Sequence, residues 1–294
     1  MNSFTIRDIE NLTGIKAHTL RIWEQRYGII TPKRKESKHR QYDNEDLKTI
    51  LRIAYLYHHG YKISKIAMMK EDEIKKLTLE NNSAGSYEVF INQLMEASID
   101  LDQDKSVRAL NSVVLHLGFE KSMYHVVYPF LEKIGLFWIT GHIIPAQEHF
   151  ASNHIRKMML VATDGLDLPA QKSKRNVIVF APENEYHEIP LLLVNYLLKK
   201  NQVSTAYLGA GVALKEIECY LQARSATHLY CHIITNLTEE PLEKFIEKLA
   251  ARFSPVQVVF SGPVVLQLDE NYNLPNVKIL RSLKEVIQFC GEKE

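Results

Sequence analysis

A helical segment near residues 16–27 carries side chains that can read bases in the major groove of DNA. At 100° per residue, one face of this segment is largely polar, with His18, Arg21, Ile22 and Gln25. The opposite face is apolar and aromatic, with Leu20, Trp23 and Tyr27. Arginine matches the acceptor pair of guanine, and glutamine matches adenine. Arg21 and Gln25 are therefore candidate base-reading residues, with His18 and Thr19 as further candidate contacts.

A basic, turn-rich loop follows this helix. Residues 31–42 hold six basic side chains and end in an aromatic residue, in the order Lys33, Arg34, Lys35, Lys38, His39, Arg40 and Tyr42. Side chains of these types hold a protein in register by contacting phosphate oxygens. The loop is therefore interpreted as a phosphate-gripping wing whose contacts are Lys33, Arg34, Lys38, Arg40 and Tyr42.

The charge distribution also favours binding to DNA. Residues 1–70 contain 14 of the 36 Lys and Arg residues but only 7 of the 35 Asp and Glu residues, although the net charge is only +1. A basic head on an acidic body is typical of a protein that binds a polyanion, because neutralising phosphates releases counterions. The alternative is an ordinary solvated charged face.

Three polar fragments farther along the chain could hold a ligand. They are Trp138, the pair Glu148-His149, and the run Glu185-Tyr186-His187 directly after an apolar stretch. Each fragment alone is weak, because a lone tryptophan is usually a core residue and a histidine after a strand is usually a polar loop residue.

Composition limits the class of protein. The chain has 294 residues, of which 46% are hydrophobic and 24% charged, which favours several soluble domains. No apolar run approaches the roughly 18 residues that span a bilayer, and charges in residues 1–10 argue against a signal peptide. We therefore expect a cytoplasmic protein without a membrane partner. Cys219, Cys231 and Cys290 lack metal-ligand spacing.

The elements that must position these residues fall into three domains. Residues 1–76 are predicted to form a winged helix-turn-helix. Thr13-Gly14 separates its first two helices, and Asp43-Asn44 begins a third helix. The core of that third helix is predicted to be Leu47, Ile50, Leu51 and Ala54. Polar residues 77–86 read as a linker.

The remaining two domains differ in their hydrophobic period. Residues 87–168 show helical spacing and predict a four-helix bundle. Residues 174–294 alternate strand and helix patterns and predict a doubly wound parallel α/β, Rossmann-like domain. The predicted strands are 177–181, 203–208, 227–234, 256–260 and 277–280, and the predicted helices are 189–199, 214–223, 241–251 and 283–289.

The N-terminal motifs resemble those of the MerR family of transcriptional regulators. The matching runs are Thr5-Ile6-Arg7-Asp8-Ile9, Thr19-Leu20-Arg21-Ile22-Trp23-Glu24, Arg40-Gln41-Tyr42 and Gly60-Tyr61-Lys62-Ile63-Ser64-Lys65-Ile66. The resemblance spans about residues 3–76. It implies a dimer on a near-palindromic double-stranded promoter site, with Arg40 and Tyr42 on the DNA backbone. The chain has no Cys-rich metal loop of the kind that metal-responsive members carry.

Behind this head, the three polar fragments together resemble the light-responsive, cobalamin-binding MerR-type repressors. The resemblance implies that His187 ligates the cobalt of adenosylcobalamin or another cobalamin from below and that Glu185 orients it. It also implies that Trp138, Glu148 and His149 cover the upper face of the cofactor. Thr235-Asn236-Leu237 resembles the family's Ser-x-Leu motif, and Ser261-Gly262 occupies the position of its Gly-Gly motif. Thr235, Leu237 and Gly262 are thus candidate cofactor contacts, in a repressor that forms a dimer or a tetramer.

Three positions depart from that pattern. Pro190 replaces a glycine three residues after the ligand histidine, Ser261 replaces the first of two glycines, and Ile139 replaces a histidine of the light-sensing members. Cobalamin binding and light sensing are therefore separate hypotheses. A ligand-independent regulator, in which the C-terminal module serves oligomerisation or protein-partner sensing, is the alternative.

A different class, a cobalamin-dependent methyl-transfer or mutase component, is least favoured. It shares the layout of the C-terminal two-thirds, but it would leave the DNA-binding head unexplained. Ser261-Gly262 lacks the glycines of a nucleophile elbow, and Gly209-Ala210-Gly211 lacks the third glycine of a dinucleotide motif. We expect no enzyme activity.

Overall fold

The computed structural model describes residues 4–30, 32–34, 40–58, 60–80, 87–139, 143–166, 174–235 and 241–292. The chain divides into two compact units, Met1–Ile155 and Arg156–Glu294. The division falls within one helix, so residues 156–164 group with the second unit although the sequence pattern assigned them to the bundle. Within the described ranges, none of the helices combines the length and the apolar character that a membrane span requires.

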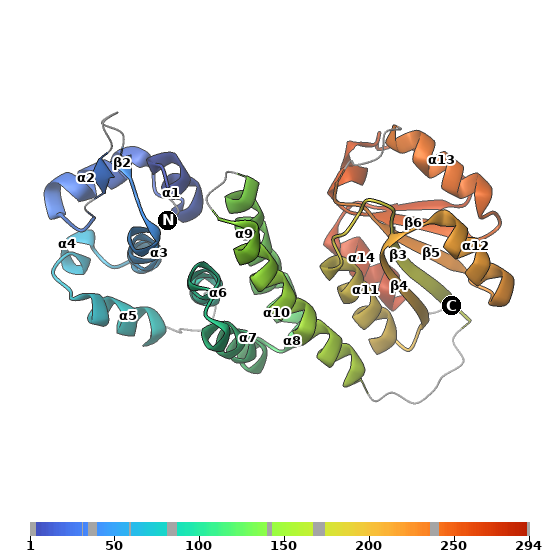
Figure 1. Cartoon of the computed structure of the whole chain (residues 1–294), viewed down its shortest axis with the longest axis horizontal. Coiled ribbons are helices and arrows are strands. Elements are labelled where there is room, and N and C mark those ends of the chain that lie inside the picture. Colours follow the sequence, from blue (N-terminus) through green and yellow to red (C-terminus); the bar gives the residue numbers. More distant parts are fainter. Residues whose placement is uncertain are drawn as a thin grey trace. The chain divides into compact units, whose positions relative to one another are not determined.

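The N-terminal head of the first unit is a small helical domain with a two-stranded hairpin (Figure 1). Its elements are α1 (Ile6–Thr13), α2 (Ala17–Tyr27), β1 (Lys33–Arg34), β2 (Arg40–Gln41), α3 (Asn44–His58), α4 (Ile63–Ile66) and α5 (Glu71–Glu80). The antiparallel β1–β2 pair is the base of the predicted wing. The predicted linker begins too early, because residues 77–80 complete α5, and residues 81–86 lie outside the described ranges.

Local capping determines where the helices of the head begin and end. The amide of Thr5 donates to Asp8 Oδ2 at 2.7 Å, in a capping box that starts α1. Gly14 ends that helix in the left-handed conformation, with φ of 69°, and provides the helix-turn-helix break. The amides of Glu45 and Asp46 donate to Asp43 Oδ1 at 3.0 and 3.1 Å, which confirms a cap for α3 at Asp43. The predicted core of α3 is buried.

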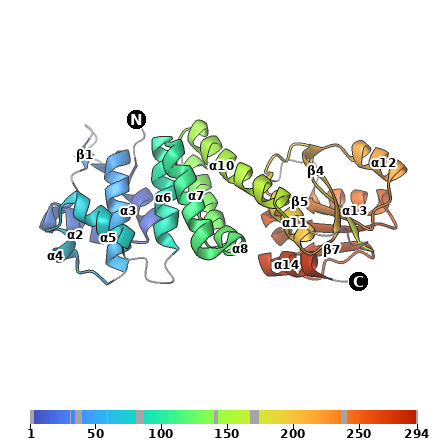
Figure 2. The same cartoon turned by 90° about the horizontal axis from the view of Figure 1, so that it is seen from below.

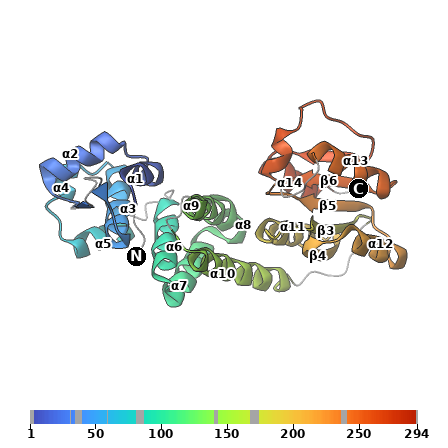
Figure 3. The ribbon, with the colours of Figure 1, turned by 45° about the horizontal axis from the view of Figure 1, so that its top comes forward.

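Residues 88–164 form the predicted four-helix arrangement (Figure 2 and Figure 3). The first, second and fourth helices are α6 (Glu88–Asp100), α7 (Gln103–Leu117) and α10 (Pro145–Asp164). The third is a continuous run through α8 (Phe119–Ser122), the π-helical turn η1 (Met123–Val127) and α9 (Tyr128–Ile139). Apolar side chains from these helices form the core of the bundle, including Phe90, Leu94, Leu110, Val113, Val127, Phe130 and Ile134.

The second unit contains a five-stranded parallel sheet in the order β4-β3-β5-β6-β7. Its elements are β3 (Asn176–Pro182), α11 (Ile189–Lys200), β4 (Ser204–Val212), α12 (Leu214–Ala223), β5 (His228–His232), α13 (Leu242–Arg252), β6 (Gln257–Ser261), the 3-10 turn η2 (Pro263–Gln267), β7 (Val277–Leu280) and α14 (Leu283–Gly291). These bounds confirm the predicted doubly wound α/β domain. The strand order reverses between β3 and β5, and doubly wound sheets bind ligands at such a switch point.

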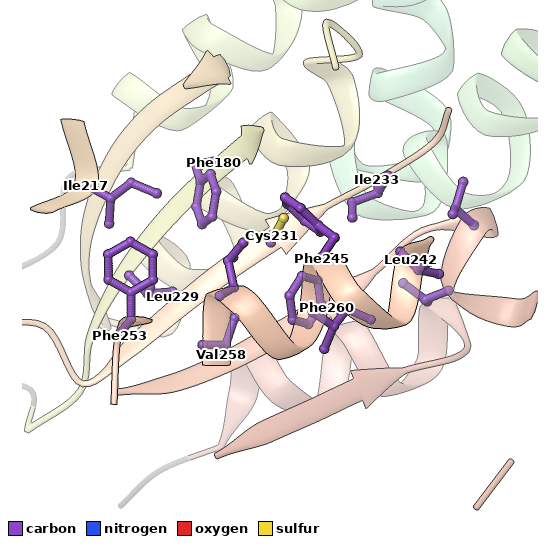
Figure 4. Close-up of a cluster of buried hydrophobic side chains, with 14 of the residues drawn as sticks. Phe180, Ile217, Leu229, Cys231, Ile233, Leu242, Phe245, Phe253, Val258 and Phe260 are labelled. Atoms are coloured by element: carbon purple, nitrogen blue, oxygen red, sulfur yellow. The ribbon is translucent and has the colours of Figure 1, made fainter. Parts of the chain in front are cut away.

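Alternate residues of the strands build the core on one face of this sheet. Side chains from β3, β5 and β6 meet those of α12 and α13 (Figure 4), and the labelled residues are Phe180, Ile217, Leu229, Cys231, Ile233, Leu242, Phe245, Phe253, Val258 and Phe260. The intervening strand residues face the other side, where Tyr230 stacks on Phe289 of α14. The near-continuous apolar strands follow from this burial on both faces.

Candidate nucleic-acid interface and ligand site

The predicted DNA-reading face of α2 is exposed to solvent. His18, Arg21, Ile22 and Gln25 are all exposed, whereas Leu20 and Trp23 are buried. Thr19 is half-buried at the edge of this face. Trp23 makes an edge-on contact with Tyr57 of α3, with ring centroids 4.9 Å apart. Trp23 thus anchors α2 to the head, and the opposite face remains available to bases.

A charged contact joins α2 to the wing. Arg40 Nε donates to Glu24 Oε2 at 2.5 Å, and both side chains are largely buried. The hydrogen bond from Arg40 to Glu24 raises the pKa of this guanidinium above its ordinary value. Arg40 therefore fixes the base of the wing against α2. Its contact with DNA phosphate stays a prediction, and that contact would use the terminal nitrogens of the guanidinium.

Tyr42 corrects a sequence expectation. Only 2% of this residue is exposed, and its backbone forms two hydrogen bonds with Phe4, at 2.8 and 3.0 Å. Burial raises the pKa of Tyr42 to about 12. Tyr42 is therefore a core residue of the head, and its surface is too small to support a major role on the DNA backbone. The sequence pattern misplaced it because aromatic residues are common both in cores and at nucleic-acid surfaces.

The remaining wing residues are only partly described. Lys33 and Arg34 form β1, but their side chains are outside the described part of the structure. Lys38 also lies outside the described residues. Their predicted phosphate contacts stay predictions.

Glu185 is the centre of the polar site in the α/β domain. It lies in the loop between β3 and α11 and is 2% exposed. The amides of Ile234 and Thr235 donate to its Oε2 at 2.8 Å each, and the Thr235 hydroxyl donates at 3.0 Å. Burial by itself would raise the pKa of Glu185, but hydrogen bonds from His187 and from these amides outweigh it and lower the pKa to about 2.

His187 faces the other oxygen of the same carboxylate. Its Nδ1 lies 2.5 Å from Glu185 Oε1, and its amide donates to that oxygen at 3.1 Å. The carboxylate therefore holds the Nδ1–H tautomer, in which Nε2 carries the lone pair that can coordinate a metal. The His187 side chain is 52% exposed at the carboxyl end of β3. The predicted contact between Glu185 and His187 is present, and the role of His187 as a cobalt ligand stays a prediction.

Tyr230 and His232 of β5, which the sequence did not indicate as site residues, contact Ser261 at the end of β6. Ser261 Oγ lies 2.7 Å from His232 Nδ1 and 2.6 Å from the Tyr230 hydroxyl. Burial lowers the pKa of His232 to about 4, so its imidazole is neutral at pH 7. His232 pairs with Ser261 in the strand register. A histidine inside a predicted apolar strand, residues 227–234, was the only signal in the sequence for His232.

The departures at Pro190 and Ser261 have clear local roles. Pro190 lies in the first turn of α11, where a missing amide hydrogen costs no helical hydrogen bond. Ser261 is buried where the family pattern has a glycine. Its hydroxyl forms hydrogen bonds with two polar neighbours, Tyr230 and His232. Gly262 has φ of 111°, and a Cβ at this position would lie 2.1 Å from the Ile233 carbonyl oxygen. Glycine at 262 is thus required by the backbone itself.

The other candidate ligand residues are on the bundle or outside the described ranges. Trp138 is exposed near the end of α9, and His149 is exposed just after the first turn of α10. Glu148 accepts a hydrogen bond from Ser152 and lies 3.7 Å from His149 Nε2. Leu237 lies outside the described residues, as does the side chain of Ile139.

Residues 4–73 match the model of the MerR HTH family regulatory protein, and residues 90–162 match the B12 binding domain. The chain is 29% identical over 262 residues to the HTH-type transcriptional repressor CarA of Myxococcus xanthus, a match that covers 87% of this chain and 85% of that protein. It is 26% identical over 222 residues to the repressor CarH of the same organism, with 73% of each chain covered. The monomethylamine corrinoid protein of Methanosarcina barkeri has a similar fold, with a TM-score of 0.55 and 14% identity over 70% of this chain and 99% of that protein.

These matches confirm two of the predicted modules. The head is a MerR-type helix-turn-helix domain, and the bundle is a B12-binding domain. At 14% identity, the likeness to the corrinoid protein supports the fold alone.

Proposed function

We propose that this chain, a homologue of the CarA and CarH repressors that joins a MerR-type head to a B12-binding module, is a transcriptional repressor whose DNA binding responds to a bound cobalamin. Glu185 and His187 are the observation that carries the proposal. A buried carboxylate that holds a half-exposed imidazole at the switch point of a doubly wound sheet is a suitable way to present Nε2 to cobalt.

The donor set fits a corrinoid better than a bare metal ion. No group of three or more metal-ligating side chains occurs in the part of the chain that is described. A corrinoid needs only one donor from the protein, because its ring supplies the other nitrogen ligands. When bound, the cobalamin would supply a cobalt centre, and His187 would be the residue that holds it through Nε2.

Each remaining candidate has a role in this proposal. Glu185 sets the tautomer of His187, and Thr235 and Gly262 shape the nearby loops. Trp138, Glu148 and His149 would contact the cofactor, and Leu237 would line the channel for its nucleotide tail. The form with an upper adenosyl group is the one proposed, because the exposed Trp138 offers an aromatic surface on which an adenine can stack.

On the DNA side, two sets of residues act differently. His18, Thr19, Arg21 and Gln25 contact bases from α2, whereas Lys33, Arg34 and Lys38 hold phosphates. The protein binds double-stranded promoter DNA as a homodimer or a larger homo-oligomer, since a two-fold operator requires two heads. No catalytic step is part of this proposal.

The cofactor proposal is tested by absorbance after purification in the dark. Full-length protein is incubated with adenosylcobalamin, desalted and scanned for retained corrin absorbance, alongside His187→Ala. His116→Ala is the matched control, because His116 is an exposed histidine of α7 that bonds a carbonyl of its own helix. We expect retention by the wild type and the control, with a changed spectrum or loss in His187→Ala.

A second candidate function is a ligand-independent regulator whose C-terminal module serves only assembly. The contacts at Ser261 favour it, because a buried hydroxyl that bridges Tyr230 and His232 stabilises the strand ends without any ligand. Absence of corrin absorbance in desalted wild-type protein, together with specific DNA binding, would establish this alternative and remove the first.

A further inference from the structure

Helix α3 of the head carries two basic side chains that are buried against the bundle. Lys48 is 6% exposed and Arg52 is 9% exposed, one turn apart on the same face. Buried cations of this kind are uncommon unless they are paired. Both have partners on α6, the first helix of the B12-binding module, and both lie within the unit Met1–Ile155.

Arg52 makes the more specific contact. Its Nε donates to Glu96 Oε1 at 2.9 Å and its Nη2 donates to Glu96 Oε2 at 2.7 Å, a two-pronged pairing that fixes both side-chain planes. Its Nη1 also donates to Glu71 of α5 at 3.3 Å. One guanidinium therefore joins two helices of the head to the bundle, across 44 positions of sequence in the case of Glu96.

Lys48 repeats the connection farther along the same helices. Its Nζ lies 2.6 Å from Asp100 Oδ1 and 2.8 Å from Glu45 within α3. Two ion pairs at separate points along α3 and α6 resist rotation as well as separation. A single covalent connection between α5 and α6 could not do this.

An aromatic contact joins the wing side of the head to the bundle. The rings of Phe4 and Phe137 meet edge to face with centroids 5.6 Å apart, and both are buried. Phe4 pairs through its backbone with Tyr42, which follows β2 of the wing. Phe137 immediately precedes Trp138, one of the candidate cofactor contacts. The wing base and the proposed ligand-facing end of α9 therefore share one packed contact.

We propose that Lys48 and Arg52 are positioning residues that hold the DNA-binding head in one orientation on the B12-binding module. This inference rests on the proposed function, because it concerns how that module controls the head. With the head held, two heads of an oligomer present their α2 helices at a defined separation, and the protein selects operators by the spacing of their half-sites.

The test compares spacing preference with binding to one half-site. Full-length protein is titrated with duplexes that carry two half-sites at several separations, and with a duplex that carries one. Arg52→Ala should reduce the preference for the best spacing about tenfold and leave single half-site affinity within about twofold. The charge swap Arg52→Glu with Glu96→Arg should restore most of the preference. Arg252→Ala, which breaks the exposed pair with Glu218, is the matched control and should change neither quantity.

Two results would overturn the inference. One is an unchanged spacing preference in both Arg52→Ala and Lys48→Ala. The other is an equal loss of affinity for one and two half-sites, which would mean that Arg52 supports only the fold of the head.

Failure of this inference can be distinguished from failure of the proposed function. Spacing preference is measured both with and without adenosylcobalamin, so failure to retain a corrin still leaves one measurement. If no DNA is bound specifically in either condition, the proposed function fails, and amide hydrogen exchange then tests the coupling. Arg52→Ala should increase exchange in both α3 and α6, and an increase in α3 alone would refute the coupling.

Discussion

Thr235 donates its amide and its hydroxyl to the same oxygen of Glu185, at 2.8 and 3.0 Å. These residues are 50 positions apart, in the loops that follow β5 and β3. The carboxylate thus spans the point at which the strand order reverses, and its second oxygen holds His187. Glu185 both supports the loops of the site and orients the candidate cobalt ligand.

Substitution of Glu185 should therefore affect stability and cofactor binding together. Glu185→Gln removes the charge that accepts these hydrogen bonds, and we expect a loss of about 2–3 kcal/mol in the free energy of unfolding. Corrin retention should fall as well, because His187 loses the group that sets its tautomer. Urea unfolding and the absorbance of desalted protein measure the two effects. Glu183→Gln is the control, because Glu183 is exposed in the same loop.

The depressed pKa of Glu185 predicts a specific acid sensitivity. Because the folded pKa is about 2 and the ordinary value is 4.5, the ionised form is stabilised by folding. That stabilisation, on the order of 3 kcal/mol, is fully present above about pH 4.5 and is lost as the pH falls toward 2. The difference in unfolding free energy between wild type and Glu185→Gln should shrink over this range. A difference that stays constant between pH 6 and pH 3 would contradict the assignment.

Gly262 should tolerate no side chain. Gly262→Ala would place a Cβ 2.1 Å from the Ile233 carbonyl at a φ of 111°, and we expect destabilisation of at least about 2 kcal/mol. Gly291→Ala is the matched control near the end of α14, where no atom lies within 4 Å of the added Cβ, and it should be neutral or slightly stabilising. Thermal unfolding monitored by circular dichroism compares the two variants.

Substitutions of Arg21 and Arg26 should affect DNA binding differently, because only Arg21 is predicted to contact bases. Both are exposed on α2, but Arg26 lies over the ring of Tyr27, with its Cζ 5.6 Å from the centroid. Arg21→Ala should reduce discrimination among operator variants by about 1–3 kcal/mol. Arg26→Ala should change affinity for all of these sequences by a similar factor. Fluorescence anisotropy with a panel of substituted operators provides the comparison.

Phosphate contacts should be visible as salt dependence. Lys33→Ala should weaken binding to specific and unrelated DNA alike, and it should reduce the slope of log affinity against log salt by about one. Lys62→Ala, which removes a lysine before α4, shows whether the effect belongs to the wing. A salt slope near zero in the wild-type protein would refute the electrostatic account of the head.

The amino-acid sequence by itself determined the modules and the faces of their helices. Amphipathic spacing located the buried Leu20 and Trp23 and the exposed Arg21 and Gln25, because helix period and burial are local properties. The strand and helix alternation likewise predicted the parallel sheet. These features depend on neighbours within a few residues along the chain.

Only the tertiary structure decided which distant side chains meet. Tyr42 looked like a wing residue but lies in the core. Glu185 bonds Thr235, Arg52 bonds Glu96 and Ser261 bonds His232, across 50, 44 and 29 positions of sequence. Hydrogen bonds and ion pairs of this kind depend on strand order and helix packing, which bring together residues that no local period relates. The pairing of His187 with Glu185 was within reach of the sequence, since the two lie in one loop, whereas the anchoring of that carboxylate by Thr235 required the fold.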